Sequence, residues 1–316
     1  MVFNYCINDW NAVLLGSTII NTIVFSIAAR YLFLITLKVT GSRNFSHRTW
    51  LMFCISPATV FFLAPYSEAL FCALTFAGIH HCLCQNFLPA SAFFTLSAAT
   101  RSNGWLNIGH MWYQLLLIVF MSSPKEKQSR KKHRILTTIS KIKSNWRLGL
   151  KILALSAFSV SPFVLYQWFA YNQFCRLYPN TLPQPVKEWL SSEGAVVAGS
   201  SIAQWCNDWP PISYTFVQSS YWGVGFLRYY KLKQVPNFLL ATPMLALVSL
   251  YTVLSVLSLL KSLKSVRSTR PKPTPVVVPE IHPIFGLQCF SFAVHSAFLA
   301  IYILLCAHVQ VWRNHF

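Results

Sequence analysis

One carboxylate, Glu68, is embedded in a hydrophobic segment of the sequence. Placing a charge at the centre of a bilayer costs about 3 kcal/mol on insertion scales, so such a residue is usually paired or lines a cavity. Arg101 ends the adjacent short apolar segment and is its natural partner. We expect the two side chains to neutralise one another or to hold a phosphate together. In the alternative interpretation, Glu68 ends a helix near a proline turn and is simply solvated.

A second acid, Asp208, is the only one in the aromatic-rich stretch 204–243. Tryptophan and tyrosine rings concentrate where a membrane meets water, and rings beside amides can also stack on and hydrogen-bond to sugars. We therefore interpret this stretch as the rim of a membrane-embedded site. Asp208 is a candidate catalytic residue there, although an aspartate before Trp-Pro-Pro often only caps a turn.

A cluster of metal-binding residue types occurs at His80, His81, Cys82 and Cys84. Residues three or four apart can share a helix face, so pairs from this cluster could point the same way. No second cluster follows at a recognised zinc spacing. We therefore predict that the protein binds no metal.

The composition indicates a membrane protein. Hydrophobic residues make up 54% of the 316 positions and charged residues 10%, with a mean hydropathy of +0.46. Most of such a chain cannot form a soluble surface. The net charge of +19 is concentrated in three polar linkers, which argues against a nucleic-acid partner. The basic run 125–134 is interpreted as a topology anchor that touches anionic lipid.

We predict an all-α fold, a polytopic transmembrane helical bundle that forms a single multi-pass domain over residues 1–316. The segments long enough to cross a bilayer are residues 12–37, 148–170, 236–260 and 284–307. Residues 51–121 add two or four passes. The positive-inside rule places the basic linker 122–147 and the proline-rich basic linker 261–283 in the cytosol, and the loop 171–235 in the lumen. Cys175 and Cys206 of that loop could pair if the lumen is oxidising.

Three blocks of the sequence resemble a known family. They read SPATVFFLAPYSEALF at 56–71, ATRSNG at 99–104 and WC…PPISYTFVQSSYWGVGFLRYYKLKQVPNFLLATP at 205–243. In type and order these blocks resemble the GPI mannosyltransferase II family (PIG-V type). The likeness covers about residues 51–121 and 204–310.

The resemblance implies a GT-C-like glycosyltransferase of the endoplasmic-reticulum membrane. Such an enzyme transfers the second mannose of the GPI anchor, in α1,6 linkage, from dolichyl-phosphate mannose to mannosylated glucosaminyl-phosphatidylinositol. No cofactor is implied besides the donor lipid. The expected partners are these two lipids, the surrounding membrane lipid and a small membrane subunit.

This chemistry requires a base for the acceptor hydroxyl, donors for the departing phosphate and a pocket for a cationic sugar transition state. Glu68 and Asp208 are the candidate catalytic acids. We expect Arg101 and Arg228 to contact the phosphate. The remaining candidate substrate-binding residues carry amides or aromatic rings: Asn103, Gln218, Tyr221, Trp222 and Asn237.

The sequence departs from the family pattern at both ends. Family members resemble one another in a first luminal loop whose acid, next to a tryptophan, is thought to be the general base. Here only eleven residues precede the first apolar segment, and the Asp9-Trp10 pair has the reverse order. The family's continuation beyond Gln310 is also missing. We therefore expect a truncated chain, or a base role for one of the two acids named above.

Two other functions are alternatives to the enzyme. One is a catalytically inactive truncated form, and the other is a lipid-binding or transporter-like membrane protein without catalysis. Transporters commonly contain inverted repeats with paired broken helices. Prolines interrupt apolar segments at Pro57, Pro65 and Pro162, but the sequence contains no matching halves.

Overall fold

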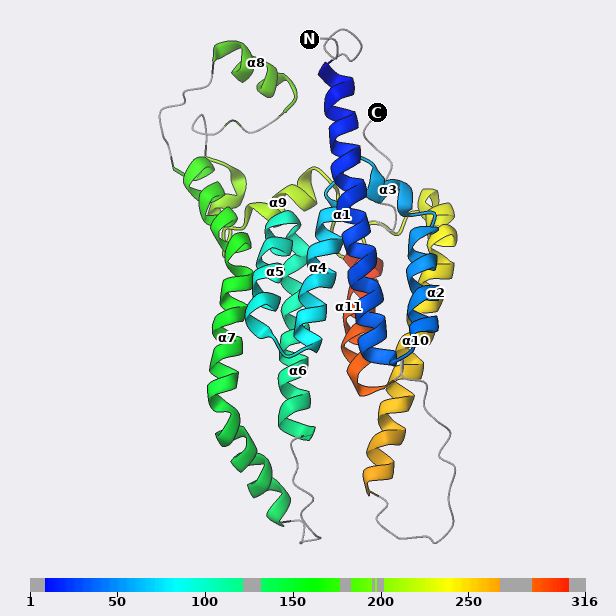
Figure 1. Cartoon of the computed structure of the whole chain (residues 1–316). Helices are drawn as coiled ribbons and strands as arrows, with labels where there is room; N and C mark the ends of the chain where they lie inside the picture. Colours follow the sequence, from blue (N-terminus) through cyan, green and yellow to red (C-terminus); the bar gives the residue numbers. More distant parts are fainter. Residues whose placement is uncertain are drawn as a thin grey trace. The chain divides into compact units, whose positions relative to one another are not determined.

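The computed structural model describes residues 9–121, 132–176, 183–194, 197, 202–267 and 286–306. Regular structure in these residues is helical throughout, which confirms the all-α prediction (Figure 1). The single multi-pass domain predicted from the sequence contains two compact units. The first is Met1–Pro162 with Thr269–Ser291, and the second is Phe163–Ser268 with Phe292–Phe316.

Among the described residues, four helices are long and apolar enough to cross a membrane, and each contains or overlaps a predicted span. They are α1 (Asp9–Thr40), α7 (Lys132–Phe174), α10 (Val235–Arg267) and α11 (Phe290–Cys306). Their length and composition make the chain a multi-pass membrane protein.

Pro162 lies inside α7 without ending it, contrary to the interruption expected from the sequence. Proline has no N–H to donate to the carbonyl four residues earlier, which here belongs to Phe158. The Ser161 hydroxyl donates to that carbonyl at 2.8 Å instead. A neighbouring hydroxyl can satisfy the freed backbone group in this way, so the helix continues.

The region 51–121 forms short helices rather than uniform long spans. It contains the end of α2 (Arg43–Cys54), then α3 (Thr59–Leu63), α4 (Glu68–Leu83), α5 (Phe87–Thr100), η2 (Ser102–Asn107) and α6 (Ile108–Met121). Pro57 and Pro65 fall between helices, as predicted. At 1.5 Å per residue, α4 and α5 are roughly 24 and 21 Å long, shorter than the hydrocarbon core of about 30 Å.

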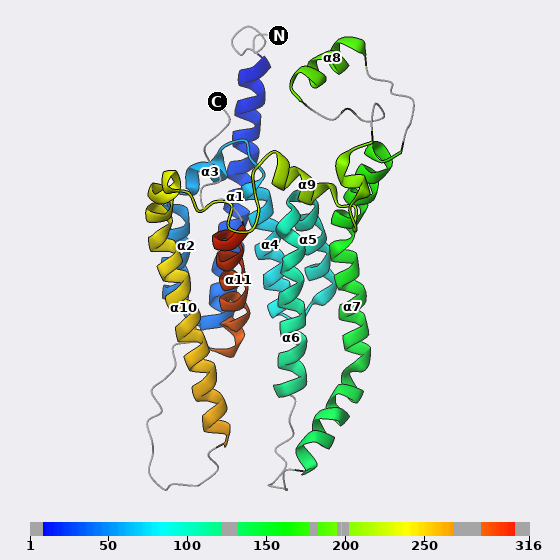
Figure 2. The same ribbon diagram turned by 180° about the vertical axis from the view of Figure 1, so that it is seen from behind.

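Helix α4 packs between α1 and α5 (Figure 1). Ala69, Ala73 and Ala77 are buried at four-residue spacing, and small residues at this spacing allow helices to approach closely. Gly78 continues the close contact, because a Cβ there would lie 2.4 Å from the ring of Phe94. In the view from behind, α6 runs beside α4 and α5 (Figure 2).

The second unit contains most of the predicted luminal loop. Its short elements are α8 (Gln184–Ser192), η3 (Gln204–Asn207), α9 (Ser213–Ser220) and η4 (Leu232–Gln234). Cys175 and Cys206 form a disulfide with a Cα–Cα distance of 5.5 Å, which answers the question that the sequence left open. The bond ties the end of α7 to η3 beside a small core around Trp205.

The predicted cytosolic linkers are only partly described. Residues 122–131 and 268–283 lie outside the described residues, and the helices α7 and α10 include the remainder of each linker. Which side of the membrane each linker and the loop occupy stays a prediction.

Candidate functional site

The helix hairpin of α4 and α5 brings Glu68 and Arg101 together. Glu68 is the first residue of α4, and Arg101 is the C-cap of α5. A helix stabilises an anion at its N-terminus and a cation at its C-terminus by about 0.3–1 kcal/mol each. Because the two helices are antiparallel, both favoured positions lie at the same end of the hairpin.

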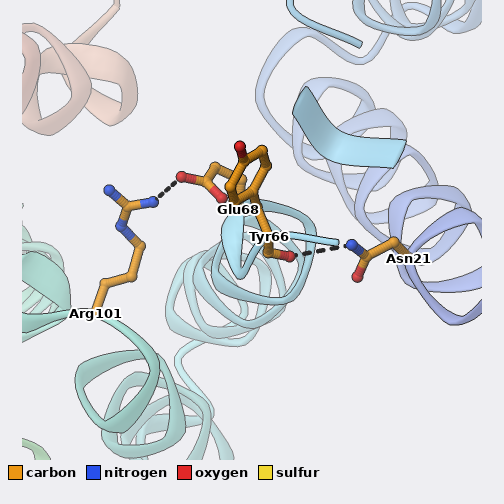
Figure 3. Close-up of polar contacts among 4 residues, drawn as sticks. All are labelled: Asn21, Tyr66, Glu68 and Arg101. Atoms are coloured by element: carbon orange, nitrogen blue, oxygen red, sulfur yellow. Dashed lines mark hydrogen bonds and ion pairs between the residues drawn. The ribbon is translucent and has the colours of Figure 1, made fainter. Parts of the chain in front are cut away.

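The predicted pairing of these two side chains is confirmed. Arg101 Nη1 donates to Glu68 Oε1 in a salt bridge (Figure 3). The side chains are half-buried, with 35% of Arg101 and 32% of Glu68 exposed. The guanidinium carbon also lies 5.9 Å from the ring centre of Phe71, one turn into α4. Glu68 is therefore paired at its helix end and is not simply solvated.

The second oxygen of Glu68 has a different environment. Oε2 is buried, and within the described part of the chain it has no hydrogen-bond partner. A buried polar atom without a partner costs roughly 1–3 kcal/mol, and more when it is charged. One oxygen of this carboxylate is thus occupied by Arg101, and the other is enclosed by the protein.

Asn21 of α1 completes the site and was missed by the sequence analysis. Its side-chain amide donates to the carbonyls of Ala64 and Tyr66, the second at 3.1 Å. These carbonyls belong to the Pro65 turn directly before α4. Figure 3 shows Asn21 and Arg101 approaching this segment from opposite sides. The available signal was that Asn21 is the only amide side chain in the apolar segment 12–37, since polar groups within spanning helices are commonly functional.

A buried polar cluster anchors the turn that follows Arg101. Asn107 Nδ2 donates to Thr75 Oγ1 at 3.1 Å and to Ser97 Oγ at 3.2 Å. The two hydroxyls are 2.9 Å apart. Gly104 lies directly against the backbone of Ser97, where a Cβ would be 2.5 Å from the carbonyl carbon. Asn103, predicted to bind substrate, is exposed in this same turn.

The second unit holds the predicted aromatic and amide residues. Gln218 is half-buried near the end of α9, and Tyr221 and Trp222 follow it with 54% and 48% exposed. Gln167 of α7 positions α9, because its Oε1 accepts from Ser213 Oγ at 2.8 Å and from the N–H of Tyr214 at 3.3 Å. The sequence analysis missed Gln167.

Arg228 and Asn237 are placed by the turn before α10. The N–H of Gly225 donates to the carbonyl of Cys306 at 2.9 Å, which ties this turn to the end of α11. The Arg228 side chain folds over Gly225, where a Cβ would be 2.7 Å from Arg228 Cδ. Asn237 Nδ2 donates to the hydroxyl oxygen of the buried Tyr229 at 2.8 Å, so this amide supports the turn.

The candidate residues belong to two different units. Glu68, Arg101 and Asn103 lie in the first, whereas Asp208 and the residues from Gln218 to Asn237 lie in the second. Asp208 is exposed beside Trp209, which is 95% exposed. The assignment of both groups to one site stays a prediction.

The histidine and cysteine cluster forms ring contacts. His81 stacks on Phe93 with ring centres 5.5 Å apart, and His80 lies 5.8 Å from the ring of Tyr31. Among the residues that the structure describes, no group of three or more His, Cys, Asp or Glu side chains is arranged to hold a metal ion.

The fold and site define a multi-pass membrane protein with a carboxylate–guanidinium pair at the ends of two short helices. A sequence model of the mannosyltransferase (PIG-V) family matches residues 7–315. The chain therefore belongs to the PIG-V mannosyltransferase family. This confirms the resemblance noted in the sequence.

Individual relatives are similar over most of this chain. The human GPI alpha-1,6-mannosyltransferase 2 is 32% identical over 305 residues, which cover 95% of this chain and 59% of the relative. The Cricetulus griseus protein of the same name is 34% identical, covering 83% and 51%. The GPI mannosyltransferase 2 of Drosophila melanogaster is 30% identical, covering 92% and 61%. The chain thus spans between half and two thirds of the length of these relatives. No solved structure matches it.

Proposed function

We propose that this chain carries the α1,6-mannosyltransferase activity of GPI-anchor biosynthesis. It transfers the second mannose from dolichyl-phosphate mannose to the mannosylated GPI precursor in the endoplasmic-reticulum membrane. Membership of the PIG-V family and the names of the relatives support the reaction class. The donor, the acceptor and the organelle are part of the proposal.

The observation that carries the proposal is the ion pair of Glu68 and Arg101. Glycosyl transfer from a lipid phosphate needs a carboxylate to accept the proton of the acceptor hydroxyl and a cation to stabilise the departing phosphate. Both groups lie within contact distance at one end of the α4–α5 hairpin and are partly exposed. A half-buried ionic pair in a membrane protein is by default a candidate functional site.

The depth of the pair also supports the proposal. Seventeen residues separate Asn21 from Lys38 along α1, which corresponds to about 26 Å of helix. This distance is close to the hydrocarbon thickness of about 30 Å. The Asn21 contact therefore holds the Glu68 turn near the end of the first unit that is opposite to the basic residues of the α1–α2 connection. Under the positive-inside assignment this end faces the lumen.

The second unit supplies the proposed sugar-binding residues. Tyr221 and Trp222 present exposed rings, Gln218 is near them in sequence, and Arg228 is a second candidate contact for the phosphate. Asp208 remains the alternative base. The proposed reaction uses no cofactor beyond the donor lipid, and a small membrane subunit is a proposed partner that copurification would identify.

Complementation tests the proposal. The chain is expressed in cells that lack the second GPI mannose, and GPI-anchored proteins are measured at the cell surface. Rescue is expected for the wild-type chain and for the control Glu188→Gln, which neutralises an exposed acid on α8. Loss of rescue is expected for Glu68→Gln. A stably expressed wild-type chain that fails to rescue would refute the enzymatic function and favour a non-catalytic lipid-binding protein.

A further inference from the structure

We propose that the turn from Phe226 to Lys233 is a docking surface for an anionic phospholipid, whose phosphate it binds through Lys231 and Lys233. The turn lies directly before α10 in the second unit. Such binding goes beyond the proposed function and does not depend on it, because it requires no mannosyl transfer. Three features of the turn support the proposal: its exposed apolar side chains, its cations without neighbouring acids and its fixed backbone.

Two apolar side chains of this turn are strongly exposed. Phe226 is 69% and Leu232 91% exposed, whereas Tyr229 between them is buried. Transfer of apolar surface from water to an apolar layer is favourable. Leu232 is also the first residue of the candidate span that continues to Lys261, so it lies where a spanning helix meets the membrane surface. Both side chains are thus placed to contact lipid.

The same turn carries cations without neighbouring acids. Lys231 and Lys233 are exposed, and no aspartate or glutamate occurs between Asp208 and Glu280 in the sequence. Among the described residues, neither lysine forms a salt bridge. The positive-inside rule collects lysine and arginine in cytosolic loops, but it places the loop that contains this turn in the lumen. Topology therefore does not account for the two lysines, and an anionic partner outside the chain does.

The backbone of the turn is fixed by contacts within the second unit. The N–H of Leu227 donates to the carbonyl of Leu305 at 2.7 Å, in addition to the bond from Gly225 to the end of α11. Leu227 has a φ of +55°, a left-handed conformation that is uncommon for residues other than glycine. The Tyr230 ring centre lies 5.1 Å from that of Phe238 in the first turn of α10. A surface that is already ordered binds without the entropic cost of ordering a loop.

The two lysines are close enough to bind one phosphate together. They are two residues apart, so their Cα atoms are separated by at most about 7 Å. A lysine ammonium has three N–H donors and binds phosphate as a point charge. Basic residues at a membrane surface attract anionic lipids in this way.

The ligand that fits both parts of the turn is an anionic phospholipid such as phosphatidylinositol. Its phosphate lies at the bilayer surface, within reach of the lysines, and its acyl chains lie beside Phe226 and Leu232. A soluble phosphate would use only the lysines. The positively charged choline of phosphatidylcholine opposes them.

Binding of short-chain lipids to the purified, detergent-solubilised chain, measured by native mass spectrometry, tests the proposal. The wild-type chain should bind dioctanoyl-phosphatidylinositol more tightly than dioctanoyl-phosphatidylcholine or inositol phosphate. Lys231→Gln combined with Lys233→Gln should raise the Kd for phosphatidylinositol about 30-fold, which corresponds to about 2 kcal/mol. The Kd for phosphatidylcholine should stay unchanged.

Matched variants separate the turn from general effects of charge. Arg176→Gln combined with Lys187→Gln removes two cations from the same loop and should leave both Kd values unchanged. Lys231→Arg combined with Lys233→Arg keeps the charge and should bind phosphatidylinositol as the wild type does. Leu232→Ser should raise the Kd for both lipids but not for inositol phosphate, because it removes an apolar contact. If the glutamine variant fails to fold, added salt should still weaken wild-type binding of phosphatidylinositol more than that of phosphatidylcholine.

Three results would overturn the docking surface. The first is a wild-type Kd in the variant with glutamine at both lysines, or an equal rise in the control that changes Arg176 and Lys187. The second is equal affinity for phosphatidylinositol and phosphatidylcholine in the wild type. The third is binding of inositol phosphate as tight as that of the lipid, which would indicate a site for soluble phosphate. None of these results alters the test of the proposed function, which measures rescue of GPI-anchored proteins at the cell surface.

Discussion

Replacing Gly104 with alanine should separate η2 from α5 and disturb the ion pair. Gly104 lies three residues after Arg101, and its N–H donates to the Arg101 carbonyl at 2.9 Å. An added Cβ would meet three backbone atoms of α5: the carbonyl carbon and oxygen of Ser97 at 2.5 and 2.6 Å and the nitrogen of Ala98 at 2.6 Å. A flexible side chain could change rotamer to avoid the added Cβ, but the backbone of a helix cannot.

The size of the effect follows from these distances. The optimal separation of non-bonded carbon atoms is about 3.5 Å or more, so η2 must move by roughly 1 Å. Overpacking of this kind costs typically 1–3 kcal/mol, and we expect the upper end because only backbone can yield. A shift of this size also stretches the bonds from Asn107 to Thr75 and Ser97 that anchor the same turn.

Gly109→Ala is the matched control. Gly109 lies five residues further along in α6, and a Cβ added there would have no neighbouring atom within 4 Å. Alanine should there be neutral or stabilise the helix by about 0.5–1 kcal/mol. Thermal unfolding of detergent-solubilised protein should show a midpoint roughly 6 °C or more lower for Gly104→Ala than for Gly109→Ala. Equal midpoints and equal donor affinity would refute the close packing of η2 on α5.

Two further substitutions test the support of each unit. Asn21→Leu removes both hydrogen bonds to the Pro65 turn, so it should lower the free energy of unfolding by about 1–3 kcal/mol and reduce transfer. The control Thr22→Ala changes an exposed side chain that bonds only to its own helix, so its free energy of unfolding should stay within about 0.5 kcal/mol of wild type. Equal thermal midpoints for the two variants would contradict this. Cys175→Ser opens a loop whose ends are 31 residues apart and should cost about 3.5 kcal/mol. Maleimide labelling of Cys206 only in that variant or after reduction would confirm the bond, and labelling of the untreated wild-type residue would contradict it.

The long spans and the break points of the shorter helices could be predicted from the sequence. Apolar segments of more than twenty residues determine a crossing by length alone, and Pro57 and Pro65 cannot occupy a helix interior cheaply. Pro162 was misjudged because Ser161, the residue beside it, replaces the missing hydrogen bond. Whether a proline ends a helix depends on such neighbours, and residue type alone does not specify them.

The candidate site was only partly predictable, for a related reason. Glu68 begins α4 and Arg101 follows the last residue of α5, so the antiparallel hairpin brings the two residues to the same end. Asn21 contacts carbonyls 43 and 45 residues away, which requires α1 to pack on the Pro65 turn in one register. Asn237 stays a predicted sugar contact, and the sequence did not reveal that its Nδ2 donates to Tyr229. Contacts of this kind depend on tertiary packing, which a single sequence does not reveal.

The position of the pair at helix ends also bears on whether it can open. Removing one partner of an ion pair buried deep in a protein typically costs 3–5 kcal/mol, because the other charge is left unsolvated. At the end of the α4–α5 hairpin each charge keeps a favourable helix terminus and partial exposure after separation. The cost of removing either partner should therefore be smaller than for an ion pair buried mid-helix, where neither charge would have a helix terminus or solvent in its place.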